Sequence, residues 1–266
     1  MMVNVVMLPA VIEAGELSGH EVVVFDVLRA TTSMTAALAA GAAGLWLFSS
    51  VDEARAAVRP GSPQAVRPGS PQADQLGLPQ AAVEADRPLL AGEIRAVRPE
   101  GFDLGNSPGE YTAQRVSGRR VFMATTNGTK AILACAAAGA EHVWAGALVN
   151  ASAVARRVTA AGTPVTLVCS GTYGKVSLED VLGAGAVMAA MREMAAIEPG
   201  NDAAVMALEL YEAMRGDLAG ALRRGQGGKN VHAAHLDADV EFAARLDSLD
   251  VVGLARGTPW VVRRAE

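Results

Sequence analysis

The sequence is poor in cysteine, in aromatic residues and in lysine, and these shortages exclude several classes of protein. Two cysteines among 266 residues, Cys135 and Cys169, cannot build a disulfide framework. They suit a reducing cytoplasm, where we expect the protein to act, and the first residues lack the pattern of a signal peptide. Aromatic residues make up only 4%, so the core must consist mostly of alanine, valine, leucine and methionine. A net charge of −5 gives no electrostatic reason to expect nucleic acid as a partner.

The charge-free stretch at residues 30–51 has the length of a membrane span but not its pattern. Glycines interrupt its middle, and serines and threonines crowd both ends. A helix that ends at Gly41, followed by a short strand at 45–48, explains the stretch better, with Thr31 or Thr32 as the helix cap. We therefore expect no membrane partner.

An octapeptide, AVRPGSPQ, occurs twice in tandem at residues 57–72. Its Pro-Gly pairs can propagate neither a helix nor a central strand. We interpret it as a duplication tolerated in a surface loop, after a short helix that Ser50 and Glu53 begin with a capping box. We expect residues 1–266 to form a single domain around this loop.

Short apolar runs alternate with longer helical patterns along most of the chain. The runs followed by small polar loops and helices lie at 22–25, 121–124 and 164–169. This alternation predicts βαβ units and a mainly parallel sheet, with helices on both faces in a three-layer αβα fold. The last third should be largely helical, with closing strands at 251–252 and 260–262.

Three of the predicted strand-to-helix junctions share one pattern. They read DVLRATT (26–32), TTNGTK (125–130) and SGTYGK (170–175). Free N–H groups at a helix N-terminus, which glycine lets a ligand approach closely, can bind an anion. Because ligands of such sheets bind outside the carboxyl ends of the strands, we expect the three junctions to meet and form an anion site.

Lysine is rare in this sequence, and all three lysines lie beside glycine-rich turns. Only three of the 23 basic residues are lysines, and Lys130, Lys175 and Lys229 each follow a glycine-rich turn. In a chain that otherwise uses arginine, this placement indicates sites that need a compact ammonium group.

Carboxylates stand beside these junctions. Asp26 and Glu93 each end a predicted strand, Asp103 lies in the loop GFDLGNSP, and Glu179 and Asp180 open a helix. Asp26 ends a strand with a buried pattern, where an unpaired carboxylate would be costly. Hard oxygen ligands beside anion-binding amides are what a Mg²⁺ ion bridging to a phosphate requires. The sequence shows no zinc-ligand spacing, P-loop or dinucleotide-binding fingerprint.

Several segments together resemble the 2-phosphosulfolactate phosphatase family, in order and nearly from end to end. They are DVLRATTS (26–33), GFDLGNSP (101–108), TTNGT (125–129), NAS (150–152), CSGTYG (169–174), SLED (177–180) and LDSLDVV (246–252). The resemblance implies an αβα enzyme that uses Mg²⁺ to hydrolyse 2-phospho-3-sulfolactate to 3-sulfolactate and phosphate, a step toward coenzyme M. The GQGGKN segment at 225–230 departs from the family pattern.

The resemblance also implies roles for individual residues. Asp26 would be a metal ligand or the acid that handles the phosphate, and Arg29 the clamp on an anionic oxygen, because a guanidinium can pair with two oxygens at once. Asp180 completes the expected catalytic set. The other expected metal ligands are Glu93, Asp103 and Glu179. The residues expected to bind the phosphorylated substrate are Thr31, Thr32, Asn106, Ser107, Thr126, Asn127, Gly128, Thr129, Ser170, Gly171 and Lys175.

Two alternatives remain open at this point. The first is a cysteine hydrolase of the isochorismatase-like type, with Cys169 as nucleophile and Asp26 and Lys175 as base and activator. The second is an anion-binding module without catalytic activity. Whichever function holds, we expect the protein to form a homodimer, because the alanine-rich later helices offer little aromatic anchoring yet much apolar surface.

Overall fold

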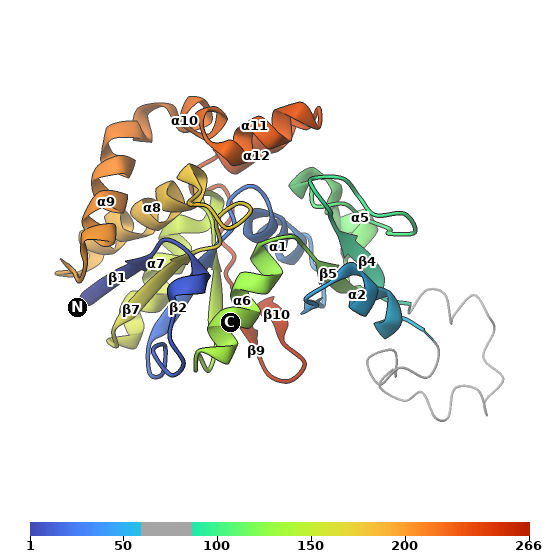
Figure 1. The fold of residues 1–266 in the computed structure, drawn as a ribbon, viewed down its shortest axis with the longest axis horizontal. Coiled ribbons are helices and arrows are strands. Elements are labelled where there is room, and N and C mark those ends of the chain that lie inside the picture. Colours follow the sequence, from blue (N-terminus) through green and yellow to red (C-terminus); the bar gives the residue numbers. More distant parts are fainter. Residues whose placement is uncertain (60–86) are drawn as a thin grey trace.

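A computed structural model describes residues 1–59 and 87–266, so most of the tandem octapeptide lies outside the described residues (Figure 1). The strands are β1 (Met2–Val6), β2 (Glu21–Phe25), β3 (Gly44–Leu47), β4 (Leu89–Gly92), β5 (Arg120–Ala124), β6 (Val143–Gly146), β7 (Val165–Cys169), β8 (Glu198–Pro199), β9 (Gly253–Arg256) and β10 (Val261–Arg264). The helices are α1 (Ala30–Ala39), α2 (Val51–Ala57), α5 (Ala113–Val116), α6 (Gly128–Ala137), α7 (Ala151–Ala161), α8 (Leu178–Met194), α9 (Asp202–Met214), α10 (Leu218–Arg224), α11 (Gln226–Ala233) and α12 (Asp237–Ala243).

Within the described residues, the ten strands form one sheet in the order β4-β5-β3-β10-β9-β6-β2-β7-β1-β8. The sheet is mostly parallel, as predicted, and contains two parallel groups: β3, β4 and β5 on one side, and β1, β2, β6, β7 and β8 on the other. The hairpin of β9 and β10 joins them through antiparallel pairs with β6 and β3. The hairpin reverses the strand direction between the groups, so β2 and β5 run in opposite directions, and yet the residues that follow them lie together, with Gly128 against Asp26.

Helices cover both faces of the sheet, which confirms the three-layer αβα prediction. Along β2, alternate side chains point to opposite faces, as the two-residue repeat of a strand requires. Val22 and Val24 pack in one core cluster with residues of α1 and α6. Val23 and Phe25 pack in the other with residues of α7, α8 and α9. The strand is buried over its whole length, so its end carries Asp26 into the interior.

The C-terminal third is largely helical, as predicted. Figure 1 shows α10, α11 and α12 as a run of short helices along the top of the view. The closing strands β9 and β10 begin one or two residues later than expected and form the hairpin within the sheet. The charge-free stretch at 30–51 forms α1, a turn and β3, and no helix of the described residues is long and apolar enough to cross a membrane.

The start of α1 differs from the prediction that Thr31 or Thr32 caps it. The helix begins at Ala30, with Arg29 in the N-cap position, and both threonines lie inside its first turn. The carboxylate of Asp26 accepts the N–H of Ala30 at 3.2 Å. An acid from the end of the preceding strand therefore satisfies a helix amide that a local hydroxyl was expected to bind.

The capping box predicted for α2 is half confirmed. The hydroxyl of Ser50 accepts the N–H of Glu53 at 3.2 Å, as expected. The carboxylate of Glu53 reaches one residue further back, to the N–H and the hydroxyl of Ser49. The helix start is thus held by two serines rather than one.

Candidate active site

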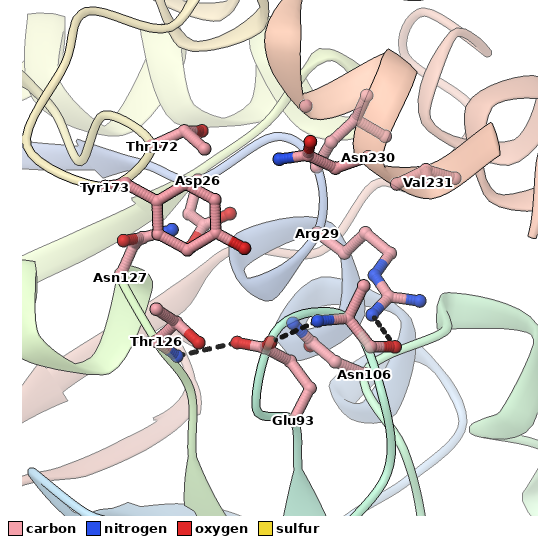
Figure 2. Close-up of a pocket in the computed structure, with 13 residues that line it drawn as sticks. Asp26, Arg29, Glu93, Asn106, Thr126, Asn127, Thr172, Tyr173, Asn230 and Val231 are labelled. Carbon is pink, nitrogen blue, oxygen red and sulfur yellow. Dashed lines mark hydrogen bonds between the residues drawn. The ribbon is translucent and has the colours of Figure 1, made fainter. Parts of the chain in front are cut away.

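A pocket opens where the loops that follow β2, β4, β5 and β7 face α11 (Figure 2). The residues predicted from the sequence that line it are Asp26, Arg29, Glu93, Asn106, Thr126 and Asn127. The lining residues that sequence reasoning did not assign are Leu28, Ala96, Thr172, Tyr173, Gly227, Asn230 and Val231. Three strand-to-helix junctions therefore do converge, and the GQGGKN segment at 225–230 supplies part of the wall.

Asp26 lies at the floor of the pocket and is 5% exposed. Burial raises its pKa to about 7, although the N–H of Ala30 opposes the shift. Repulsion by Glu93 and Glu179 raises the pKa further, and the amide of Gly128 lowers it. A carboxyl group with this pKa can gain or lose a proton near neutral pH, which suits it to general acid or base catalysis.

Glu93 follows β4 and joins two of the loops that form the pocket. Its Oε1 accepts the N–H of Thr126 at 2.6 Å, and its Oε2 accepts the N–H of Ala96 at 2.8 Å (Figure 2). The side chain is 8% exposed. Both oxygens are therefore fixed in place while the carboxylate still faces the pocket.

Asp180 lies beneath the pocket and does not line it. Its Oδ1 accepts the N–H of Val27 at 2.9 Å, and its Oδ2 accepts the N–H of Gly171 at 2.9 Å and the hydroxyl of Ser170 at 3.1 Å. Burial raises the pKa of Asp180 well above its usual range, and repulsion by Asp26 adds to the shift. This carboxylate holds the β2 and β7 junctions together.

The backbone amides at the three junctions thus bind carboxylates of the chain itself. Ala30 donates to Asp26, Thr126 donates to Glu93, and Gly171 donates to Asp180. This differs from the prediction that such amides bind the substrate's anion directly. The acids are instead fixed by the amides and presented to the pocket or to the loops around it.

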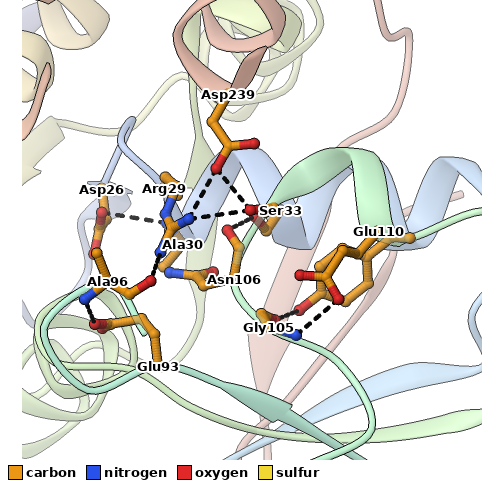
Figure 3. A network of polar contacts seen from close by, with 12 residues as sticks. Asp26, Arg29, Ala30, Ser33, Glu93, Ala96, Gly105, Asn106, Glu110 and Asp239 are labelled. Carbon is orange, nitrogen blue, oxygen red and sulfur yellow. Dashed lines mark hydrogen bonds and ion pairs between the residues drawn. The ribbon is translucent and has the colours of Figure 1, made fainter. Parts of the chain in front are cut away.

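Arg29 is held in the pocket wall by an ion pair that sequence reasoning missed. Its Nη1 donates to Oδ2 of Asp239 at 2.8 Å, and both side chains are buried (Figure 3). Asp239 lies on α12, in a stretch that looks like an ordinary acidic helix start, and no local signal marks it for burial. The charge of Arg29 is therefore already paired before any ligand binds.

The charge balance of the pocket favours a cation. Asp26 and Glu93 are its acidic lining residues, and Arg29 is the one basic side chain among the described residues that line it. Since Asp239 pairs with Arg29, neither acid has a cationic partner among the described residues that line the pocket. An anionic phosphorylated substrate would meet repulsion in this pocket unless a cation accompanied it.

The pocket also offers the donor atoms that Mg²⁺ prefers. No three histidine, cysteine, aspartate or glutamate side chains of the described residues form a ready-made metal cluster. Mg²⁺ is usually bound through only one or two carboxylates, with water and substrate phosphate completing the shell. Asp26 and Glu93 meet that requirement. The buried Oδ1 of Asn106, which has no hydrogen-bond partner among the described residues, is a further oxygen of the right kind.

Several predicted substrate-binding residues support the loops rather than line the pocket. The hydroxyl of Thr31 accepts the N–H of Asp26 at 3.0 Å, and that of Thr32 donates to the carbonyl of Val27 at 2.8 Å. The hydroxyl of Thr129 accepts the N–H of Thr125 at 3.1 Å. All three threonines are fully buried. Ser107, Gly128, Ser170 and Gly171 likewise lie behind the lining residues.

Two predicted metal ligands lie outside the pocket. The carboxylate of Asp103 pairs with Arg87 and accepts the N–H of Leu90, which fixes the loop after β4. Glu179 is 1% exposed and lies behind Gly227. Burial raises the pKa of Glu179, and its Oε2 has no hydrogen-bond partner among the described residues.

The three lysines and Cys169 are also outside the pocket. Lys130, Lys175 and Lys229 are exposed and do not line it. The sulfur-bearing side chain of Cys169 is fully buried in the core at the end of β7. Burial raises the pKa of its thiol well above the usual range. A buried neutral thiol is a packing residue rather than a nucleophile, which weighs against the cysteine hydrolase alternative.

Comparison with known proteins gives one consistent result. The 2-phosphosulpholactate phosphatase family matches residues 6–258. A protein of Symbiobacterium thermophilum named "Probable 2-phosphosulfolactate phosphatase" is 36% identical over 239 residues, which cover 90% of this chain and 92% of the relative. A protein with the same name from Synechococcus sp. (strain JA-3-3Ab) is 39% identical, over 86% of this chain and 86% of the relative. Another from Deinococcus radiodurans is also 39% identical, over 85% of this chain and 83% of the relative.

Proposed function

The chain belongs to the 2-phosphosulfolactate phosphatase family, and we propose that it hydrolyses 2-phospho-3-sulfolactate, or a related phosphorylated hydroxy acid, to 3-sulfolactate and phosphate. In this proposal it is a Mg²⁺-dependent phosphoric monoester hydrolase. The observation that carries the proposal is a pair of anchored carboxylates, Asp26 and Glu93, which face one pocket beside the guanidinium of Arg29.

The negative balance of the pocket supports the requirement for Mg²⁺. Asp26 and Glu93 would hold the ion, with Asn106 as a further oxygen donor. When bound, Mg²⁺ supplies positive charge that polarises a phosphoryl oxygen and offsets the charge that develops during transfer. Because both carboxylates are already anchored by backbone amides, they need little rearrangement to present their oxygens.

The remaining roles belong to the chain's own side chains. Asp26 can hold or release a proton near neutral pH while the ion is absent, as its raised pKa allows, and would stay ionised while it holds Mg²⁺. Arg29 would bind an anionic oxygen of the substrate and orient the molecule in the pocket. Thr126 and Asn127, at the start of α6, offer further polar groups to the substrate.

Phosphate release tests the proposal directly. Purified protein would be assayed on 2-phospho-3-sulfolactate and on a panel of other phosphorylated hydroxy acids, with Mg²⁺ and with chelator. We expect turnover with Mg²⁺, loss in chelator, and recovery when Mg²⁺ is restored. Turnover that is insensitive to chelator would reject the metal, and binding of the panel without turnover would favour the anion-binding module.

A cysteine variant separates the phosphatase from the cysteine hydrolase. Cys169→Ser is expected to retain phosphate release, because the side chain is buried away from the pocket. Near-total loss of activity in folded Cys169→Ser protein would favour the cysteine hydrolase over the phosphatase.

A further inference from the structure

The guanidinium of Arg29 is fixed by residues from three segments that are far apart in the sequence (Figure 3). Nη1 donates to Oδ2 of Asp239 at 2.8 Å and to the hydroxyl of Ser107 at 3.1 Å. Nη2 donates to the carbonyl of Ala96 at 3.0 Å. Asp239 is 210 positions from Arg29 and comes from α12, beyond the helix that walls the pocket.

Asp239 and Arg29 form a closed arrangement with Ser107. The hydroxyl of Ser107 donates to Oδ2 of Asp239 at 2.7 Å while it accepts from Arg29. The two charged side chains are 4% and 7% exposed, so neither can exchange its partner for bulk water. Arg29 can therefore adopt few other positions as long as Asp239 is present.

Part of the guanidinium stays available to a ligand. It has five N–H groups. The contacts to Asp239, Ser107 and Ala96 use three of them. The Nε–H and one Nη2–H have no partner among the described residues, and Arg29 lines the pocket.

We propose that Asp239 is a positioning residue for the reaction: by holding Nη1 of Arg29, it aims the remaining N–H groups at an anionic oxygen of the substrate. This inference rests on the proposed phosphatase function. Ser107 assists by bridging the two charged groups. Asp239 itself does not line the pocket.

The charge of Asp239 makes the KM of an Asp239 variant a test of the proposal. A carboxylate near the pocket repels an anionic substrate, so an effect of charge alone would make Asp239→Asn bind the substrate more tightly. Loss of positioning would instead weaken binding and raise KM, because a mobile Arg29 must be ordered again each time a substrate binds. The direction of the change in KM therefore distinguishes the two.

The experiment compares kcat and KM of Asp239→Asn, Ser107→Ala, Arg29→Lys and the double variant Arg29→Lys/Asp239→Asn on 2-phospho-3-sulfolactate. We expect Asp239→Asn to raise KM by about tenfold with a smaller change in kcat, and Ser107→Ala to raise it several-fold. In the Arg29→Lys background, Asp239→Asn should cause no further loss in kcat/KM, because Asp239 acts through Arg29.

Glu241→Gln is the matched control. Glu241 lies on the same helix as Asp239 and also pairs with an arginine of another segment, Arg223, but that pair is exposed. The substitution removes the same charge, and both kinetic constants should stay at the wild-type value. Circular dichroism and thermal unfolding would establish that each variant folds. If Asp239→Asn does not fold, Ser107→Ala carries the test, because it leaves no charge unpaired.

Each outcome decides the matter. Any of three results would overturn the inference while leaving the phosphatase function intact. They are a lower or unchanged KM in folded Asp239→Asn, losses that multiply in the double variant, and an equal effect of Glu241→Gln. If wild-type protein releases no phosphate, calorimetric binding of 2-phospho-3-sulfolactate replaces the assay. Binding weakened by Asp239→Asn would then support the inference although the proposed function had failed, and binding unchanged or absent would overturn it.

Discussion

Gly128 lies directly against Asp26, although the strands that precede them belong to different parallel groups of the sheet. A Cβ at position 128 would lie 2.8 Å from Oδ2 of Asp26 and 2.6 Å from the Cβ of Ala30. The missing side chain lets the start of α6 approach the acid, where the Gly128 amide favours the charged carboxylate. One glycine thus brings the β2 and β5 junctions together at the floor of the pocket.

Gly128→Ala should damage this junction. The added methyl group must push α6 away from Asp26, which we expect to destabilise the protein by about 1–3 kcal/mol and to lower kcat by about tenfold. Thermal unfolding and phosphate release would measure the two effects. Gly216→Ala is the control, because a Cβ there meets nothing within 4 Å. Equal behaviour of the two variants would contradict the close approach.

Asp26→Asn should inactivate the enzyme without unfolding it. Asparagine keeps the shape of the side chain and its oxygen can still accept the N–H of Ala30. It cannot carry the charge or the proton, so we expect kcat to fall by roughly 10²-fold or more. Asp52→Asn, at an exposed position on α2, controls for the loss of one carboxylate. Near-normal kcat in folded Asp26→Asn protein would remove Asp26 from the chemistry.

The raised pKa of Asp26 makes a prediction about stability in the absence of metal. Burial raises it from 3.8 to about 7, so between these pH values the folded protein holds a proton that the unfolded chain has lost. The contribution is therefore fully present below pH 3.8 and is lost as the pH rises toward 7. Denaturant unfolding of chelator-treated protein should show this decline.

Asp26→Asn isolates that contribution. The variant has no proton to lose at position 26, so its stability should fall less steeply over the same pH range. Asp180 also has a raised pKa, and part of the decline should therefore remain. An identical slope in the two proteins would show that Asp26 does not titrate in this range.

Much of the pocket could be predicted because its signals are local. The apolar run at 22–25 predicts a buried strand, and Asp26 follows it directly, so both the strand and the unusual acid are visible in one segment. Glu93 and the segment at 126–127 follow the same logic at the ends of β4 and β5. Strand ends of this kind mark candidate residues from local sequence alone, although which ends meet depends on the arrangement of the sheet.

The remaining features depend on tertiary packing that no local pattern encodes. Asp239 becomes buried only because α12 packs over Arg29, which lies 210 positions away. The hairpin of β9 and β10 enters the middle of the sheet, whereas its short sequence indicates only two strands near the C-terminus.

The expected homodimer can be tested at an apolar groove. Val176, Met206 and Leu210 are among its lining residues, and Val176 and Met206 are 52% and 56% exposed. We predict that the protein sediments as a dimer and that Met206→Glu shifts it toward monomer, because a charge buried in an apolar interface is costly. Met194→Glu, an exposed position outside the groove, should leave the dimer unchanged. A wild-type monomer at micromolar concentration would refute the prediction.

The last prediction concerns the glycines of the GQGGKN segment, which supplies part of the pocket wall. A Cβ at position 227 would lie 1.9 Å from Oε1 of Glu179, so Gly227 is required for α11 to pack against α8. Gly227→Ala should push α11 outward, lower stability by about 1–3 kcal/mol, and raise KM because Asn230 on that helix lines the pocket.

Glu179→Ala should relieve that clash. Alone, it removes a buried carboxylate that has one unpartnered oxygen and a raised pKa, so its cost in stability should be small. Combined with Gly227→Ala, it makes room for the new methyl group, and the double variant should be more stable than the Gly227→Ala variant alone. Thermal unfolding of the four proteins gives the coupling energy directly. Additive losses would contradict the clash between the added methyl group and Glu179, and with it the role of Gly227 in the packing of α11.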